Sequence, residues 1–287
     1  MNSNVHTFIG CDAPFDESGI VIFGAPYDST TSYRPGARFG PPSIRNESFG
    51  IETYSPYIDK DITDYKIFDA GDIELPFGAP EPVLDMIEDF AAKVISAKKL
   101  PLMLGGEHLV TLGAVRAAAK AYDGLHVIQF DAHADLRDDY LGSRLSHATV
   151  MRRCGELLGY RNIHQFGIRS GDREEFAFAG HNTDMHRFNL SDISGIEERI
   201  GSAPVYLTID LDVLDPSCFP GTGTPEAGGV DFCALVNALD AVCSLNVVAA
   251  DMTELSPMYD MSGASTALAC KLTRELLLRL VKKHELN

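Results

Sequence analysis

The sequence predicts an α/β domain built on a largely parallel sheet with helices on both faces. Short apolar, β-branched runs alternate with longer helical patterns along the whole chain. Most of these runs are continuously hydrophobic, as expected for parallel strands that are buried on both faces. No linker, low-complexity tract or internal repeat interrupts the 287 residues. We therefore expect one domain that spans residues 1–287.

Seven apolar runs have the length and composition of buried strands. They are Ile20–Gly24, Lys66–Phe68, Pro101–Leu104, His126–Phe130, Asn162–Gly167, Val205–Ile209 and Val247–Ala250.

Four segments between or after these runs predict helices. Pro82–Lys99 opens with acidic residues and closes with lysines, which suits the helix dipole. Leu109–Ala121 follows a Gly-Gly turn, and Phe232–Ser244 follows Asp231, a good N-cap residue. Ser262–Lys283 is long and amphipathic, so we expect it to close the fold.

Two loops rich in glycine and proline, Tyr33–Pro42 and Phe219–Gly229, each follow an expected strand by a few residues. Ligands of open α/β sheets bind beyond the carboxyl ends of the strands. Both loops are therefore candidates for shaping a pocket.

The charge and composition exclude several classes of partner. The formal net charge is −17 and no Lys/Arg block is present, so the sequence predicts no binding to nucleic acid or to a membrane surface. The acidity suits a cationic substrate and equally serves solubility. The six cysteines form no CxxC pair, a pattern of reduced thiols. With no signal-peptide pattern and no apolar run of about 20 residues, we expect a cytoplasmic protein.

A run of potential metal ligands follows the strand expected at 126–130. Asp131, His133 and Asp135 are spaced two apart, with alanines between them. On extended backbone, side chains two apart point the same way, so these three are expected to converge.

Two further strand ends carry ligand types. Asp210 and Asp212 follow the strand expected at 205–209, and His108 follows the strand expected at 101–104. A single Asp-x-Asp or histidine is usually a cap or a packed side chain, but all of these fall at the same edge of the expected sheet. Four carboxylates and two imidazoles exceed the three protein ligands usual for one catalytic zinc. They predict two divalent ions, with Mn²⁺ favoured over zinc and cobalt, nickel and iron left open.

Two metal ions about 3.5–4 Å apart lower the pKa of a bridging water and hold hydroxide as a nucleophile. The chain contains no G-x-S-x-G, P-loop or G-x-G-x-x-G pattern. The sequence therefore predicts hydrolysis.

Two more residues could act on a substrate. Glu254 follows the strand expected at 247–250 and could bind a guanidinium, although a cap or an ion pair is almost as good an interpretation. His147 is expected to begin a helix after the Asp135 loop and could pass a proton, or could be an exposed loop histidine.

The combination of motifs resembles the ureohydrolase family of arginases, agmatinases and their relatives, over nearly the whole chain. The motifs that carry the resemblance are Gly-Gly-Glu-His at 105–108, Asp-Ala-His-Ala-Asp at 131–135 and Asp-Leu-Asp-Val-Leu-Asp-Pro at 210–216, together with segments 24–28, 34–41 and 254–260.

The resemblance implies a three-layer α/β/α fold with a mostly parallel, eight-stranded sheet. It implies two Mn²⁺ ions held by the six residues His108, Asp131, His133, Asp135, Asp210 and Asp212. It further implies that Glu254 grips a guanidinium, that His147 shuttles a proton and that Asp135 orients the bridging hydroxide. Attack on the guanidinium carbon would then release urea and an amine, and a homo-oligomer, trimer or hexamer, is expected.

Within the family, Gly-Thr-Gly-Thr-Pro at 221–225 resembles the agmatinase branch, and segment 136–147 lacks the Asn- and Ser/Thr-rich loop typical of arginases. This resemblance implies a small cationic guanidino substrate, agmatine, cleaved to putrescine and urea. Guanidinobutyrate, arginine and formimidoylglutamate stay open as substrates. With a guanidino acid, Arg137 or Arg144 could face the carboxylate. A metal-binding pseudoenzyme and a single-zinc deacetylase are less favoured, since every ligand and Glu254 are present.

Overall fold

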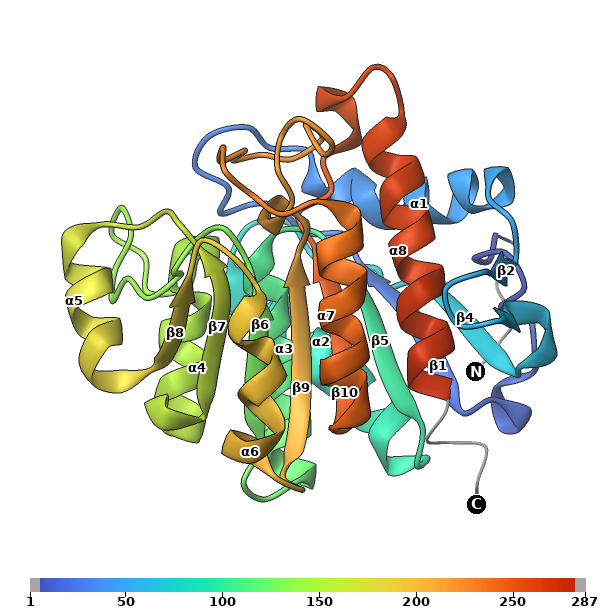
Figure 1. Cartoon of the computed structure of the whole chain (residues 1–287), viewed down its shortest axis with the longest axis horizontal. Coiled ribbons are helices and arrows are strands. Elements are labelled where there is room, and N and C mark those ends of the chain that lie inside the picture. Colours follow the sequence, from blue (N-terminus) through green and yellow to red (C-terminus); the bar gives the residue numbers. More distant parts are fainter. Residues whose placement is uncertain (1–5, 282–287) are drawn as a thin grey trace.

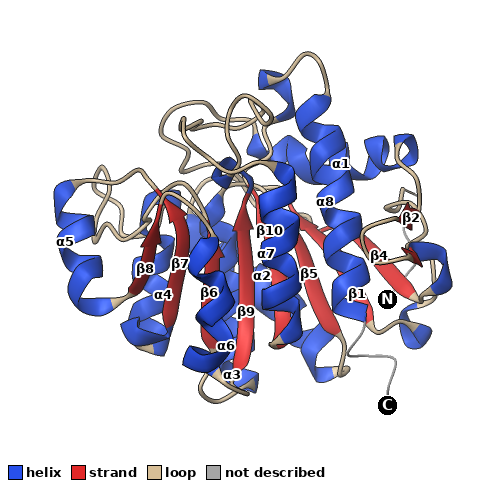
Figure 2. Cartoon of the chain, in the orientation of Figure 1, coloured by secondary structure: helices blue, strands red, loops and turns tan. Residues whose placement is uncertain are grey.

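An eight-stranded parallel sheet forms the middle layer of the protein (Figures 1 and 2). The structure is a computed structural model that describes residues 6–281. The strands, in their order across the sheet, are β4 (Ile67–Asp72), β1 (Ile20–Ala25), β5 (Leu100–Gly105), β10 (Asn246–Thr253), β9 (Pro204–Asp210), β6 (His126–Phe130), β7 (Ile163–Ile168) and β8 (Asp184–Arg187). All neighbouring pairs run parallel, which confirms the predicted fold class.

All seven predicted strands are present, but most are longer than predicted, and three other strands were missed. β4 continues to Asp72 and β10 to Thr253. The eighth strand, β8, has the sequence Asp-Met-His-Arg and lies half-exposed at the edge of the sheet, so it lacks the apolar run of a buried strand. A small antiparallel pair, β2 (Tyr54–Ser55) and β3 (Lys60–Asp61), lies outside the main sheet.

Helices cover both faces of the sheet, which makes three layers (Figure 1). One face packs against α1 (Gly40–Glu47), α6 (Ile196–Ile200), α7 (Phe232–Ser244) and α8 (Ala264–Leu280). The other face packs against α2 (Pro80–Ser96), α3 (Thr111–Ala121), α4 (Val150–Leu158) and α5 (Arg173–Asn182). Each face has its own buried cluster: Ile128 and Leu207 point to the first layer of helices, and Val127 and Tyr206 point to the second. This alternation explains why the strands read as continuous apolar runs.

Short 3₁₀ turns join these elements. They are Phe15–Glu17, Ala37–Phe39, Ser48–Gly50, Ile62–Asp64, His108–Val110, His147–Thr149, Tyr160–Asn162, Ser191–Gly195, Leu211–Val213 and Pro257–Tyr259.

The predicted helices differ from the observed ones mainly at their ends. α7 has the predicted bounds, and the Asp231 side chain accepts a hydrogen bond from the backbone N–H of Ala234 at 2.8 Å. α2 begins two residues early and ends at Ser96. α8 begins at Ala264, and the end expected at Lys283 lies outside the described residues.

Three helices were not predicted: α1, α5 and α6. A helix was expected to begin at His147, and there the structure has a 3₁₀ turn that leads into α4. α1 begins inside the segment 33–42 that was expected to be loop, so this prediction was wrong at its end. Its two prolines stand in the first turn, where a missing N–H costs no intrahelical hydrogen bond. Among the described residues, no helix is both long and apolar enough to cross a membrane.

The four central strands β5, β10, β9 and β6 end side by side at one edge of the sheet, the upper edge in Figure 2. Arg34 ties two loops above this edge, because its guanidinium donates to the carbonyl oxygens of Gly223 and Thr222 at 3.1 and 2.6 Å. It also stacks 4.3 Å from the centre of the Tyr259 ring. The loops predicted to lie near a pocket therefore meet over the centre of the sheet.

Candidate active site and metal centre

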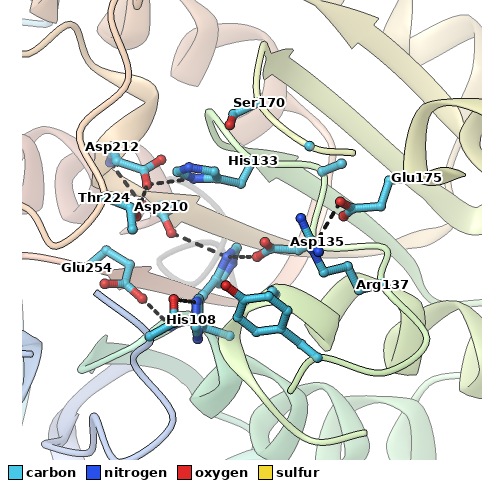
Figure 3. Close-up of a pocket in the computed structure, with 16 residues that line it drawn as sticks. His108, His133, Asp135, Arg137, Ser170, Glu175, Asp210, Asp212, Thr224 and Glu254 are labelled. Carbon is cyan, nitrogen blue, oxygen red and sulfur yellow. Dashed lines mark hydrogen bonds and ion pairs between the residues drawn. The ribbon is translucent and has the colours of Figure 1, made fainter. Parts of the chain in front are cut away.

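Each of the four central strands leads to a polar side chain at or just beneath one pocket of about 240 Å³ (Figure 3). His108 begins the 3₁₀ turn after β5, Asp131 directly follows β6, Asp210 ends β9 and Glu254 directly follows β10. Parallel strands end at the same edge, so these positions converge although they are far apart in the chain. The pocket is lined by His108, His133, Asp135, His147, Asp210, Asp212 and Glu254 among other residues, and Asp131 lies buried against its ligand partners.

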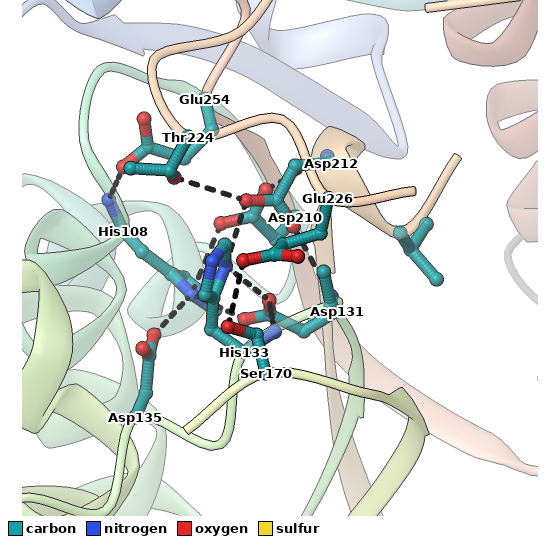
Figure 4. Close-up of polar contacts among 12 residues, drawn as sticks. His108, Asp131, His133, Asp135, Ser170, Asp210, Asp212, Thr224, Glu226 and Glu254 are labelled. Atoms are coloured by element: carbon teal, nitrogen blue, oxygen red, sulfur yellow. Dashed lines mark hydrogen bonds and ion pairs between the residues drawn. The ribbon is translucent and has the colours of Figure 1, made fainter. Parts of the chain in front are cut away.

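Five of the six residues proposed as metal ligands form two groups that share Asp131, and the sixth, Asp210, lies beside the first group (Figure 4). In the first group, His108 Nδ1 lies 3.0 Å from Asp131 Oδ2 and 2.9 Å from Asp135 Oδ2. Asp210 Oδ2 is 3.4 Å from the same nitrogen.

In the second group, His133 Nδ1 lies 2.9 Å from Asp212 Oδ2 and 3.6 Å from Asp131 Oδ1. The two oxygens of Asp131 thus face different imidazoles. This is the arrangement expected of a carboxylate that bridges two cations.

The backbone that carries Asp135 differs from the prediction. The extended geometry was expected to continue through Asp131, His133 and Asp135, but β6 ends at Phe130 and Asp135 has a φ of 52°. Glu254 also has a positive φ, 65°. Left-handed backbone costs a non-glycine residue on the order of 1–3 kcal/mol and clusters at functional sites. A turn, and not strand alternation, therefore brings Asp135 to His108.

Burial and crowding dominate the electrostatics of the four aspartates. Their exposed fractions are 0% for Asp131, 6% for Asp135, 3% for Asp210 and 1% for Asp212. Burial, together with the charge of Asp131, raises the pKa of Asp135 to about 7, and burial with the charge of Asp212 raises the pKa of Asp210. Burial also opposes ionisation of Asp131, but hydrogen bonds to His108 and His133 outweigh it and lower the pKa of that carboxyl.

These donors fit divalent cations. Four buried carboxylates held within reach of one another are costly unless cations neutralise them. None of the residues that line the pocket is a cysteine, so the donors are carboxylate oxygen and imidazole nitrogen. This donor set suits Mn²⁺ and its neighbours better than it suits thiolate-bound metals.

Glu254 is held beside the metal ligands by the backbone. Its Oε1 accepts a hydrogen bond from the N–H of His108 at 2.8 Å, and its own N–H donates to the Gly106 carbonyl at 2.9 Å. Burial and the nearby charge of Glu107 raise the pKa of Glu254 to about 8. A carboxylate in this state gains most from a cationic ligand, which would restore its ionised form.

His147 lies at the mouth of the pocket, at the start of the turn that leads into α4, as predicted. Its N–H donates to Thr30 Oγ1 at 3.1 Å, and its Nε2 is 3.2 Å from Ser32 Oγ. Burial lowers the pKa of His147 to about 4. The ring is therefore neutral near pH 7, and it must accept a proton before it can deliver one.

Some residues around the site carried no signal strong enough to be singled out in the sequence. Ser32 lines the pocket and is one of them. Thr224 also lines it and comes from the loop 219–229 that was predicted to shape a pocket, whereas none of the lining residues comes from the loop 33–42. Glu107 is fully buried and accepts hydrogen bonds from the N–H and the hydroxyl of Thr30 at 2.9 and 2.5 Å. Thr30 Oγ1 also accepts a hydrogen bond from the His147 N–H. Glu107, which precedes His108, is therefore linked through Thr30 to His147 at the pocket mouth.

Comparison with known proteins finds relatives that match this chain over nearly its whole length. A family model described as the arginase family matches residues 18–279. The agmatinase of Bacillus cereus is 47% identical over 279 residues, which cover 96% of each chain.

Two solved structures have the same fold over nearly their whole length. The agmatine ureohydrolase of Thermoplasma volcanium superposes with a TM-score of 0.89 at 33% identity, covering 98% of this chain and 96% of that one. The proclavaminate amidino hydrolase from Streptomyces clavuligerus gives 0.88 at 34% identity, covering 98% and 99%.

Replacing the shared carboxylate is expected to remove metal binding without unfolding the protein. Asp131→Asn keeps the side-chain volume but loses the charge that faces both imidazoles. We expect at least one of two metal ions to be lost and activity to fall about 100-fold or more, since bound metals contribute several kcal/mol to such reactions. Metal analysis, urea release and circular dichroism measure the three effects. The exposed Asp89→Asn is the control, and an Asp131→Asn protein with two ions and normal turnover would contradict the binuclear site.

The chelated protein is expected to lose stability as the pH rises from 5 to 8. Asp135 and Glu107 have pKa values raised to about 7 and Glu254 to about 8, against about 4 in an unfolded chain. The nearby carboxylates also raise the pKa of His108 and of His133. All of these groups bind more protons in the folded state over this range, so unfolding becomes easier as they are released.

Between pH 5 and pH 8, we expect the free energy of unfolding of the chelated protein to drop by more than about 1.4 kcal/mol. This is the free energy that corresponds to a shift of one pKa unit in one group. Thermal unfolding at pH 5 and pH 8, with chelator and with Mn²⁺, measures it. The stabilisation by Mn²⁺ should be greater at pH 8. Equal stabilisation at both pH values would show that the buried acids are not what the metal neutralises.

Proposed function

Because the chain belongs to the arginase family, we propose that it is a ureohydrolase that cleaves agmatine to putrescine and urea with the help of two Mn²⁺ ions. The observation that carries the choice of substrate is the charge of the pocket rim. Agmatine has a guanidinium at one end and an amine at the other, with no carboxylate. A guanidino acid would instead need an available cation opposite its carboxylate.

The two arginines that could serve a guanidino acid are both engaged with carboxylates. Arg137 lines the pocket, but its guanidinium lies 3.3 Å from Asp172 and 3.3 Å from Glu175. Arg144 lies 2.9 Å from Asp138 and 3.0 Å from Glu156. Asp138 and Glu156 also contact Arg153, and Arg144 does not line the pocket. Because Arg137, which does line it, faces two carboxylates, the rim favours a cationic tail over an anionic one.

Metal ions bound by the two ligand groups would lower the pKa of a shared water and supply the nucleophile. Mn²⁺ is proposed because the donors are carboxylates and imidazoles.

The protein side chains would bind and orient the substrate. Glu254 lies next to the ligand groups, with Oε1 fixed by the His108 N–H, and its second oxygen is available to pair with the guanidinium. A guanidinium paired with that oxygen would have its carbon beside the proposed metal ligands. Asp135, next to His108, would orient the nucleophile.

His147 would move the proton. Since the ring is neutral near pH 7, it can accept a proton during the attack and pass it to the departing amine nitrogen. Ser32, which contacts Nε2, keeps the ring turned towards the mouth of the pocket.

The first test of the proposal is urea release by the Mn²⁺-loaded protein from agmatine, arginine and 4-guanidinobutyrate, with a chelated sample as control. We expect agmatine to be preferred and chelation to abolish the activity. Preference for 4-guanidinobutyrate would show that the carboxylates around Arg137 do not set the specificity. An absence of urea from all three would move the proposal to formimidoylglutamate or to a non-catalytic role.

Glu254→Gln tests the guanidinium contact. The amide keeps the shape of the side chain but cannot form a charge-assisted pair, a loss of about 1.5–3 kcal/mol. We expect kcat/KM for agmatine to fall about 10- to 100-fold while two metal ions remain bound. Steady-state kinetics and metal analysis measure this, with the exposed Glu74→Gln as control. An unchanged kcat/KM would exclude Glu254 from substrate binding.

A further inference from the structure

A fully buried carboxylate, Asp251, lies within β10 and belongs neither to the proposed ligand set nor to the pocket lining. Its register partner on β9 is Thr208. Thr208 Oγ1 lies 2.6 Å from Asp251 Oδ1, and the phenol oxygen of Tyr206 lies 2.5 Å from Asp251 Oδ2. Both hydroxyl residues are also fully buried.

Thr208 connects this carboxylate to the metal centre. Its Oγ1 is 2.9 Å from Nε2 of His108, while Nδ1 of the same ring faces Asp131, Asp135 and Asp210. The buried path therefore runs from Asp251 through one hydroxyl to the far side of a proposed metal ligand.

The direction of these hydrogen bonds follows from proton counting. An ionised carboxylate can only accept, so both hydroxyls donate to Asp251. Burial raises the pKa of Asp251, but the hydroxyls of Thr208 and Tyr206 counteract this because they favour the ionised form. The single proton of the Thr208 hydroxyl is thus committed to Asp251, and its oxygen can only accept from His108 Nε2. Thr111 Oγ1 lies 3.4 Å from the same oxygen, and the Thr111 hydroxyl also favours the ionised form of Asp251.

The consequence for His108 is a fixed tautomer. If Nε2 carries the proton, the Nδ1 lone pair is directed at three carboxylates, an arrangement that is favourable only with a cation between them. The opposite direction, with Thr208 donating to Nε2, would put the proton on Nδ1 and block the metal.

We propose that Asp251 is a positioning residue for the metal centre: through Thr208 it holds the Nε2–H form of His108 and so sets the affinity for the ion on the His108 side. The inference rests on the proposed metal site but not on the identity of the substrate. Tyr206 secures the second oxygen of the carboxylate and takes no part in the path to His108.

The difference between Tyr206 and Asp251 gives a matched test. Tyr206→Phe removes one hydrogen bond to Asp251 and leaves the link to Thr208 intact. Adding Asp251→Leu to that variant removes the carboxylate without leaving a buried phenol unpaired. The concentration of free Mn²⁺, followed by its electron paramagnetic resonance signal during titration, gives the number and affinity of bound ions without any assay of activity.

We expect two Mn²⁺ ions in the wild-type protein and in Tyr206→Phe. In the double variant, one of the two should bind about 10- to 100-fold more weakly, the usual effect of losing such an outer partner. Equal affinities for both ions in Tyr206→Phe and in the double variant would overturn the inference. A wild-type protein that binds no Mn²⁺ would instead overturn the proposed cofactor.

Substitution of Thr208 gives an independent test if the double variant does not fold, as judged by circular dichroism. Thr208→Val has nearly the same shape but cannot accept from His108, so the same single ion should be weakened. Thr208→Ser retains the hydroxyl and should restore the wild-type affinity. If Thr208→Val binds both ions like the wild type, the path from Asp251 to His108 has no role in metal binding.

Discussion

The burial of four carboxylates within a few ångströms of one another is the constraint on which the rest of the site depends. Asp131, Asp135, Asp210 and Asp212 are almost inaccessible to water, and each raises the cost of ionising its neighbours. Such a group is tolerated in a folded protein only when cations neutralise it. The imidazoles of His108 and His133, each directed at a different oxygen of Asp131, divide this charge into two groups. The centre is therefore built for two cations.

The order of the strands explains how these residues come to lie so close together. β5, β10, β9 and β6 are neighbours, so residues up to 146 positions apart, such as His108 and Glu254, meet at one edge. The strands beneath them are apolar on both faces and packed by two layers of helices, which keeps the edge rigid. At this edge, the turns at Asp135 and Glu254 adopt the left-handed backbone that points these carboxylates inwards.

Charge pairing extends from the metal centre to the pocket mouth. At the inner end, Glu254 is buried beside the proposed ligands, and its Oε1 accepts a hydrogen bond from the His108 N–H, so this carboxylate suits a guanidinium. At the rim, carboxylates surround the one arginine that lines the pocket. A substrate with positive charge at both ends meets favourable charge at both ends. This separates agmatine from guanidino acids more directly than any single motif does.

The sequence by itself determined the fold class, seven of the eight strands of the main sheet and all six proposed ligands, because each of these leaves a local pattern. Buried parallel strands are apolar runs, and the ligands follow them directly in the chain. The tertiary structure alone decided what depends on neighbours distant in sequence. β8 is a strand because it pairs with β7, although its own residues are polar. From the sequence, Arg137 was a candidate to bind a substrate carboxylate, but in the structure its guanidinium contacts Asp172 and Glu175. The sequence assigned no role to Asp251, which contacts Thr208, and through it His108, only because β9 pairs with β10. A hydrogen-bond partner is fixed by strand order and register, which no local pattern in the sequence records.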